Sequence, residues 1–420
     1  MKYDFDRQVN RIGTQAIKWE FSGEKRNPVH LRPTDMCAGE AGVLPMWIAD
    51  MDFPCPQPVV DVLVARAGHG FYGYTDTPDS YYASIVGWMK RRHGWEVDPE
   101  WICTTPGVVP ALNFLVQTFV SNGEQVLIQP PVYHPFFSAI ENNAAFVTGN
   151  PLVLKDRRYH MDFNDLAERV SDPKVKMAIL CNPHNPVGRV WTRQELLRFG
   201  ELCLKNNVLI VSDEIYADIV YQGKIFTPFA ALGEAYTQQA IICTAPSKTF
   251  NLAGLQTSNI VIPNPELRAR FLRTLEKQGL FGIGVFGGVA LEAAYLHGEE
   301  WLEQVLVYLE ENLNYLESYL DHDIPGIRLI SPEGTYLAWL DCRGLGLEQA
   351  ELKKLMLKEA RLHLEDGAVY GQEGEGFMRM NIACPRSILV EALERIRAAI
   401  EARGLTEEIS SYPQASPPWP

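Results

Sequence analysis

The sequence predicts an α/β protein with a mostly parallel central sheet sandwiched by helices, together with a smaller α+β domain. Several short apolar runs, such as 177–181 and 208–212, contain no alternating polar residues, which is typical of strands buried on both faces. Segments with apolar residues at helical spacing, such as 193–206, separate these runs. From about residue 280 the pattern becomes mostly helical, which indicates a second unit.

The first part of the chain is expected to hold the large sheet. Two helices, at 56–68 and 78–93, flank an aromatic turn. From about residue 101 strands and helices alternate: we predict strands at 125–129, 177–181, 208–212, 240–243 and 259–262, and helices at 109–121, 193–206 and 266–278. This alternation predicts βαβ units and therefore a parallel sheet.

The C-terminal part is expected to form the smaller unit. We predict a long amphipathic helix at 298–320, short strands at 327–329 and 335–340, and helices at 348–360 and 387–403. The resulting division is a large domain at 46–290, a small domain formed by 291–405 with the N-terminal arm 1–45, and a loose proline-rich tail at 406–420.

Composition and charge exclude several classes of protein. The net charge of −14 disfavours nucleic acid as a partner, and no run reaches the roughly 18 apolar residues that span a bilayer. The eight cysteines form no CxxC pair and the nine histidines form no HExxH motif, so we expect reduced thiols and no metal site. The charged N-terminus leads into no apolar stretch, and we expect a cytoplasmic protein.

Three polar segments follow predicted strands. Asn185 lies in the segment 182–189, Asp213 and Tyr216 end the next strand, and Ser247 and Lys248 follow a third. Because ligands bind at the carboxyl ends of strands in open α/β sheets, we expect these side chains to meet in one crevice. Each alone has an ordinary interpretation, as a turn, a helix start, a core aromatic or a surface lysine.

Together these residue types suit pyridoxal 5′-phosphate (PLP). A partly desolvated Lys248 would bond covalently to the coenzyme aldehyde, and Asp213 would keep the ring nitrogen protonated. Asn185 and Tyr216 can donate hydrogen bonds to the phenolate oxygen of the ring. Tyr133 follows another strand and can stack on the ring.

The phosphate and the substrate need further groups. Gly107, Val108 and Val109 open a predicted helix, whose N-terminus offers free N–H groups to a phosphate, although a plain helix start is the alternative. Arg379 lies in a short apolar strand and suits a carboxylate of the substrate, although a structural salt bridge is the alternative. The GxGxxG string at 282–287 follows a helix rather than a strand, which argues against a dinucleotide site.

These motifs resemble the fold-type I PLP enzymes of the class I/II aminotransferase superfamily, and more narrowly the cystathionine β-lyase (C–S lyase) branch known as MalY/PatB. The likeness runs nearly end to end, through the stretches 5–19, 44–53, 182–189, 247–255 and 379–386. The NPxNPxG and SKxxxxxG patterns specify the superfamily, and the WIADMDF stretch at 47–53 points to the branch.

The resemblance implies the same roles for Lys248, Asp213, Asn185, Tyr216, Tyr133 and Arg379. It also implies a homodimer with active sites at the subunit interface, in which Tyr74, or else Tyr72, reaches the phosphate of the neighbouring subunit. Two positions depart from the pattern: Gln256 stands where many aminotransferases have arginine, and Ala245 where they have a hydroxyl residue. We therefore expect phosphate binding to depend more on the helix N-terminus.

The predicted function is β-elimination from cystathionine or another L-cysteine S-conjugate, in which Lys248 removes the Cα proton and thiol, pyruvate and ammonia are released. Transamination between an amino acid and an α-keto acid is the alternative, because it uses the same groups. A third hypothesis is a regulatory protein that binds PLP without turnover. In each case the partner is a small-molecule amino acid.

Overall fold

The computed structural model describes residues 2–20 and 42–405. Its main feature is a seven-stranded sheet in the order β2-β10-β9-β8-β7-β3-β4. The strands are β2 (Ile102–Thr105), β3 (Gln125–Ile128), β4 (Phe146–Gly149), β7 (Val175–Cys181), β8 (Leu209–Asp213), β9 (Ala240–Thr244) and β10 (Ser258–Val261). Strand β10 runs antiparallel to both of its neighbours, and the pairings from β9 to β4 are parallel. The predicted mostly parallel sheet is confirmed.

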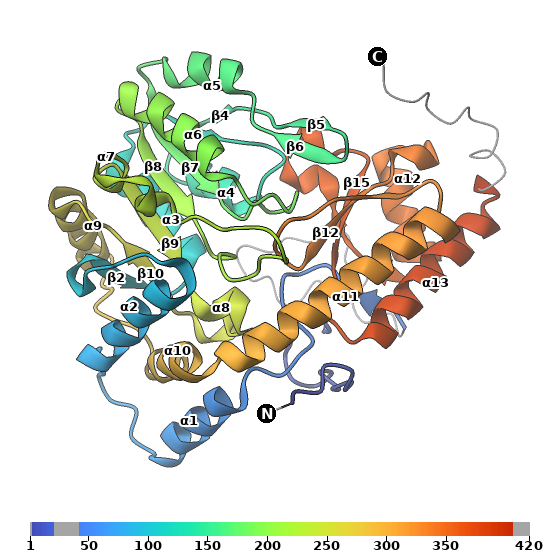
Figure 1. Ribbon diagram of the computed structural model, residues 1–420, viewed down its shortest axis with the longest axis horizontal. Helices are drawn as coiled ribbons and strands as arrows, with labels where there is room; N and C mark the ends of the chain where they lie inside the picture. The colour runs from blue at the N-terminus through green and yellow to red at the C-terminus, as the bar shows by residue number, and fades with distance from the viewer. Residues whose placement is uncertain (1, 21–41, 406–420) are drawn as a thin grey trace.

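Helices cover both faces of this sheet, as Figure 1 shows. Neighbouring residues of one strand pack into different cores: Ile241 lies in the core under α3, α4 and α9, whereas Ile242 lies in the core under α2, α6 and α10. This double burial is why the strands are apolar throughout. The helices of this unit are α1 (Gln57–Gly68), α2 (Asp79–His93), α3 (Val108–Phe119), α4 (Pro135–Glu141), α5 (Phe163–Val170), α6 (Arg193–Lys205), α7 (Glu234–Thr237), α8 (Pro246–Thr249), α9 (Pro265–Lys277) and α10 (Val285–His297).

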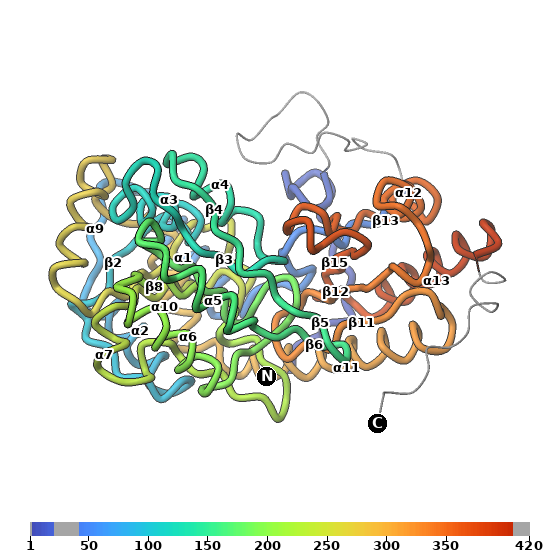
Figure 2. Tube along the Cα trace, turned by 90° about the horizontal axis from the view of Figure 1, so that it is seen from above, coloured from blue at the N-terminus to red at the C-terminus, as the bar shows by residue number. Residues whose placement is uncertain are grey.

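The smaller unit has an antiparallel sheet in the order β11-β12-β15-β14. It consists of β11 (Arg328–Ile330), β12 (Leu337–Asp341), β14 (Glu365–Asp366) and β15 (Phe377–Asn381), with helices α11 (Glu299–Asp323), α12 (Gln349–Lys354) and α13 (Arg386–Ala402). The two units lie side by side, and the long helix α11 extends along both (Figures 1 and 2). No helix in the described part of the chain is long and apolar enough to cross a bilayer.

Two short strand pairs complete the fold, β1 (Leu44–Pro45) with β13 (Leu362–His363), and β5 (Val153–Lys155) with β6 (Arg158–His160). The helix predicted at 348–360 is divided, because α12 ends at Lys354 and a π-helical turn follows at 355–359. Much of the N-terminal arm, 21–41, and the tail, 406–420, lie outside the described residues. The division into domains stays a prediction.

Gly287 of α10 allows a close approach between this helix and the loop after α8. A Cβ atom at this position would lie 1.9 Å from Thr257 Oγ1 and 2.8 Å from the Leu255 carbonyl oxygen. We expect Gly287→Ala to lower the free energy of unfolding by about 1–3 kcal/mol, because backbone and side chain must move apart. Urea unfolding measures the change.

The matched control is Gly68→Ala at the end of α1, where an added Cβ meets no described atom within 4 Å. It should change the free energy of unfolding by no more than about 1 kcal/mol, which is the difference in helix propensity between alanine and glycine. An equal loss of stability in the two variants would contradict the packing argument.

Candidate active site

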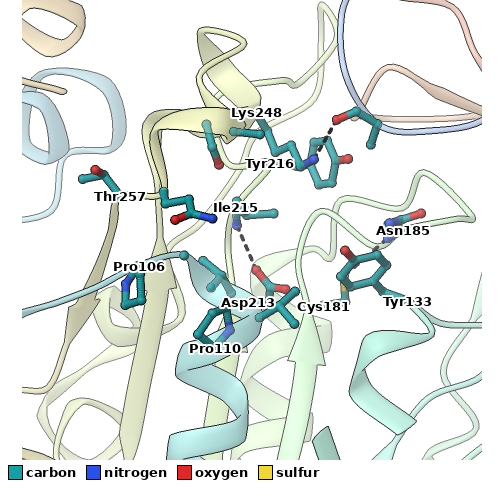
Figure 3. Close-up of a pocket in the computed structure, with 17 residues that line it drawn as sticks. Pro106, Pro110, Tyr133, Cys181, Asn185, Asp213, Ile215, Tyr216, Lys248 and Thr257 are labelled. Atoms are coloured by element: carbon teal, nitrogen blue, oxygen red, sulfur yellow. Dashed lines mark hydrogen bonds between the residues drawn. The ribbon is translucent and has the colours of Figure 1, made fainter. Parts of the chain in front are cut away.

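A pocket of about 770 Å³, counting space open to solvent, lies at the carboxyl ends of β7, β8 and β9. The three segments expected to converge there all contribute to it, as Figure 3 shows. The pocket is lined by Ala49, Pro106, Gly107, Val108, Val109, Pro110, Tyr133, Cys181, Asn185, Asp213, Ile215, Tyr216, Ser247, Lys248, Ala253, Gln256 and Thr257. Apart from Tyr74 and Arg379, every predicted site residue is among them.

Lys248 enters the pocket from the short helix α8, which directly follows β9. Its side chain is half-buried, and Nζ donates a hydrogen bond to the main-chain oxygen of Ala49 at 2.7 Å. Burial, reinforced by the positive charge of Arg379, lowers the pKa of the Lys248 amine to about 8. A substantial fraction of this amine is therefore neutral near physiological pH, as nucleophilic attack and proton abstraction require.

Asp213 lies at the end of β8 and enters the pocket from a different side than Lys248 (Figure 3). It is 3% exposed, and Oδ1 accepts a hydrogen bond from the Ile215 amide at 3.2 Å. Burial raises the pKa of this carboxyl group to about 7, and the charge of Lys248 opposes the rise only in part. Such a carboxylate is suited to a cationic partner in the pocket, such as a protonated ring nitrogen.

Glu214 is equally buried but has a structural role. Its Oε1 accepts hydrogen bonds from the Ser212 hydroxyl and the Phe229 amide, both at 2.8 Å. It does not line the pocket. Of the two adjacent carboxyl groups, only Asp213 therefore faces the pocket.

Two buried polar side chains offer hydrogen bonds to a ring oxygen. Asn185 Oδ1 accepts from Arg379 Nη1 at 3.1 Å, so the amide nitrogen Nδ2 is the atom that can donate into the pocket. The Tyr216 hydroxyl is buried and has no hydrogen-bond partner of ordinary geometry among the described residues. Burial raises the pKa of Tyr216, which keeps this hydroxyl protonated and able to donate. Half-buried Tyr133 lines the same pocket.

The N-terminus of α3 forms one wall of the pocket. Gly107 precedes the helix with φ of 118°, a conformation that favours glycine, and Val108 and Val109 form the first turn. The free N–H groups of this turn and the helix dipole suit a phosphate. Gln256 also lines the pocket and is joined there by the hydroxyl residue Thr257.

Arg379 lies behind Asn185 rather than in the wall of the pocket. The guanidinium is buried in β15, where Nη2 donates to the Trp47 main-chain oxygen at 2.7 Å and lies 3.4 Å from Glu365 Oε2. Its Nε has no acceptor within the described ranges, so the guanidinium group retains a free donor.

The two tyrosines expected to reach a neighbouring subunit, Tyr72 and Tyr74, lie outside this pocket, and both are exposed.

Three residues of the site have no signal in the sequence that predicts their role. Ala49 and Ile215 line the pocket, and Glu365 opposes Arg379 across the β14–β15 ladder. Ala49 belongs to the 44–53 stretch that carries the family resemblance. Its contribution is a main-chain oxygen, which no residue type reveals.

The comparisons with known proteins agree with this geometry. Residues 46–396 match the family described as aminotransferase class I and II. The chain belongs to this family. Within it, the chain is 45% identical to cystathionine beta-lyase PatB of Bacillus subtilis, over 94% of this chain and 100% of PatB. It is 31% identical to protein MalY of Escherichia coli, over 95% of this chain and 99% of MalY.

Solved structures of the family have the same fold. Cystalysin from Treponema denticola, whose structure contains pyridoxal 5′-phosphate, superposes with a TM-score of 0.90 at 33% identity, over 96% of this chain and 100% of cystalysin. The predicted fold-type I architecture and the MalY/PatB branch are thereby confirmed.

Proposed function

We propose that the protein is a PLP-dependent carbon–sulfur β-lyase that converts cystathionine or another L-cysteine S-conjugate to a thiol, pyruvate and ammonia. The observation that carries the proposal is one pocket that contains a lysine amine of lowered pKa and a buried carboxyl group of raised pKa. The identity to a cystathionine beta-lyase over the whole length of that enzyme supports the choice of reaction.

The residues present fit the coenzyme. When bound, PLP supplies an aldehyde that bonds to amines and a ring that withdraws electrons from Cα of the substrate. Asp213 would hold the proton on the ring nitrogen, Asn185 and Tyr216 would donate to the ring hydroxyl oxygen, and Tyr133 would pack on the ring. Gly107, Val108, Val109 and Ser247 would bind the phosphate.

Lys248 would have two tasks in the reaction. Its amine, neutral in part near pH 8, would take the proton from Cα of the substrate. The resulting ammonium would then protonate the sulfur atom as the Cβ–S bond breaks. Arg379 would hold the α-carboxylate, with its charge buried close enough to the amine to lower the pKa of Lys248.

Incubation of the purified protein with cystathionine tests the proposal. We expect pyruvate and free thiol to appear in equal amounts without any α-keto acid. Turnover that requires an α-keto acid would instead establish transamination, which the family name and the aspartate aminotransferases at 26% identity make the second candidate. Bound coenzyme without turnover of either kind would favour a regulatory role.

We further propose that the protein acts as a homodimer with active sites at the subunit interface. Phe71, Tyr72, Tyr74 and Phe281 are all exposed in the single chain, and Tyr74 is fully exposed. Tyr72, Tyr74 and Phe281 line one surface hollow, and large exposed side chains that gather in this way are typical of an interface. We also propose a cytoplasmic location, where thiols such as those of the seven free cysteines in the described residues stay reduced.

Tyr74 is the residue expected to reach the phosphate of the neighbouring subunit. We expect Tyr74→Phe to weaken PLP binding about tenfold, because one hydrogen bond to a charged group is lost. Equilibrium dialysis measures the dissociation constant. The control Tyr72→Phe should change it less, since the Tyr72 hydroxyl donates to Ala67 O at 2.5 Å. Equal effects of both changes would argue against the assignment of Tyr74.

Glu365 partly neutralises the positive charge of Arg379 and should therefore weaken substrate binding. We expect Glu365→Gln to lower KM about three- to tenfold with kcat changed less than about twofold, because Arg379 loses a carboxylate that competes with the substrate. Steady-state kinetics at pH 8 measure both constants. The exposed Glu375→Gln of the same unit is the control. A KM that rises in Glu365→Gln would contradict this role.

A further inference from the structure

Residues 47–53, which we call the strap, are held mainly through their main-chain oxygens. Side chains that are distant in the sequence donate to them: Trp47 O accepts from Arg379 Nη2 at 2.7 Å, Ile48 O from Asn381 Nδ2 at 2.8 Å, and Met51 O from Asn251 Nδ2 at 2.9 Å. Asn381 lies on β15 and Asn251 follows α8, so the strap joins the smaller sheet to the segment that carries Lys248.

The centre of the strap contacts the amine of the active site. Ala49 O accepts hydrogen bonds from Lys248 Nζ at 2.7 Å and from the Tyr336 hydroxyl at 3.2 Å. A free lysine side chain has four rotatable bonds, and one firm acceptor reduces the positions that its amine samples. The location of Ala49 O therefore decides where an unbonded Lys248 amine lies.

A buried cation from the N-terminal segment fixes the strap just beyond Ala49. Lys18 is 0% exposed, and its Nζ donates to Asp50 O at 2.9 Å and to Asp52 Oδ2 at 2.6 Å. The other oxygen of Asp52 accepts from Trp19 Nε1 at 2.8 Å and from Arg11 Nη1 at 2.9 Å. Burial of a charged pair is costly in free energy, and neither Lys18 nor Asp52 lines the pocket.

We propose that Lys18 is a positioning residue for catalysis, which acts with Asp52 to hold the strap so that Ala49 O orients the amine of Lys248. The inference rests on the proposed function, in which this amine must move a proton after it is released from the coenzyme. Lys18 itself touches neither substrate nor coenzyme. A displaced strap would leave the amine free to rotate away, and catalysis depends steeply on such orientation.

Lys18→Met tests the inference, because it keeps the length of the side chain and removes its charge and both hydrogen bonds. We expect kcat to fall about tenfold and KM to change less than about twofold, since orientation of the amine affects the chemical step. Assays are run well below the midpoint of thermal unfolding, so that the variant is folded.

Uptake of PLP by the coenzyme-free protein provides a second readout. The Lys248 amine must be neutral to attack the aldehyde, so in the wild type the rate of uptake should rise with pH through about 8. In Lys18→Met we expect the midpoint to move down by about half a pH unit, because the charged amine loses the acceptor that stabilises it. The charged groups that act on this amine, Arg379, Asp50 and Asp213, are all retained.

Two controls separate positioning from stability. Lys90→Met breaks the exposed pair with Glu96, and Leu393→Ala opens the core under α13. Unchanged kcat and an unchanged uptake midpoint in folded Lys18→Met would overturn the inference, as would the same kinetic losses in Leu393→Ala. If Lys18→Met does not fold, Arg11→Met removes a partly exposed donor to the same strap and must show the same effects.

The wild type separates this inference from the proposed function. If the wild type does not take up PLP, both are overturned. If the wild type takes up PLP normally and Lys18→Met has the same kcat and uptake midpoint, this inference alone is overturned.

Discussion

Lys248→Ala is expected to reduce kcat by about a thousandfold or more, because the same amine bonds to the coenzyme and moves the substrate proton. Pyruvate release measures the loss. The visible absorbance that reports a covalent bond between lysine and coenzyme should also disappear. PLP should still bind, since the helix α3 and Asp213 are unchanged.

Lys205→Ala is the matched control, because this lysine is exposed at the end of α6, away from the pocket. It should retain the activity and the spectrum of the wild type. Lys248→Ala with kcat within about tenfold of the wild type would refute the assignment of this lysine, since a catalytic base contributes more than that.

Asp213→Asn is expected to lower kcat about a hundredfold or more, because a neutral amide cannot stabilise a positive charge on the ring nitrogen. Glu214→Gln is a close control: it changes the adjacent carboxyl group, whose burial raises its pKa to about 8, but which binds Ser212 and Phe229 instead of a ligand. We expect kcat of Glu214→Gln to stay within a few-fold of the wild type. Equal losses in both variants would show that the damage is structural.

The pH dependence of the stability of the coenzyme-free protein gives an independent measure of the pKa of Asp213. Burial raises the pKa of its carboxyl group from 3.8 to about 7, so between these values the folded state binds a proton that the unfolded state has lost. Stability should therefore fall as the pH rises from about 4 to 7. Denaturant unfolding at several pH values should show a smaller fall in Asp213→Asn, with the part due to Glu214 retained. An identical pH dependence in both proteins would contradict the raised pKa.

The positions of the main strands could be predicted because burial on both faces requires apolar residues throughout. Observed β7, β8 and β9 lie within one or two residues of the predicted runs. Strand β10 looks equally buried, yet it runs antiparallel, because burial controls the residue pattern and leaves strand direction open. Strand β2, which contains Thr104 and Thr105, lacks such an apolar run and was not predicted.

The sequence by itself determined the fold class and the set of groups at the strand ends, Asn185, Asp213, Tyr216 and Lys248. It could do so because the carboxyl ends of parallel strands meet at one edge of the sheet. Only the tertiary structure decided that Arg379 lies behind Asn185 and beside Glu365, and that Lys18 secures the strap whose Ala49 oxygen holds Lys248. Those contacts join segments far apart in the chain, partly through main-chain oxygens that every residue carries, so no local pattern encodes them.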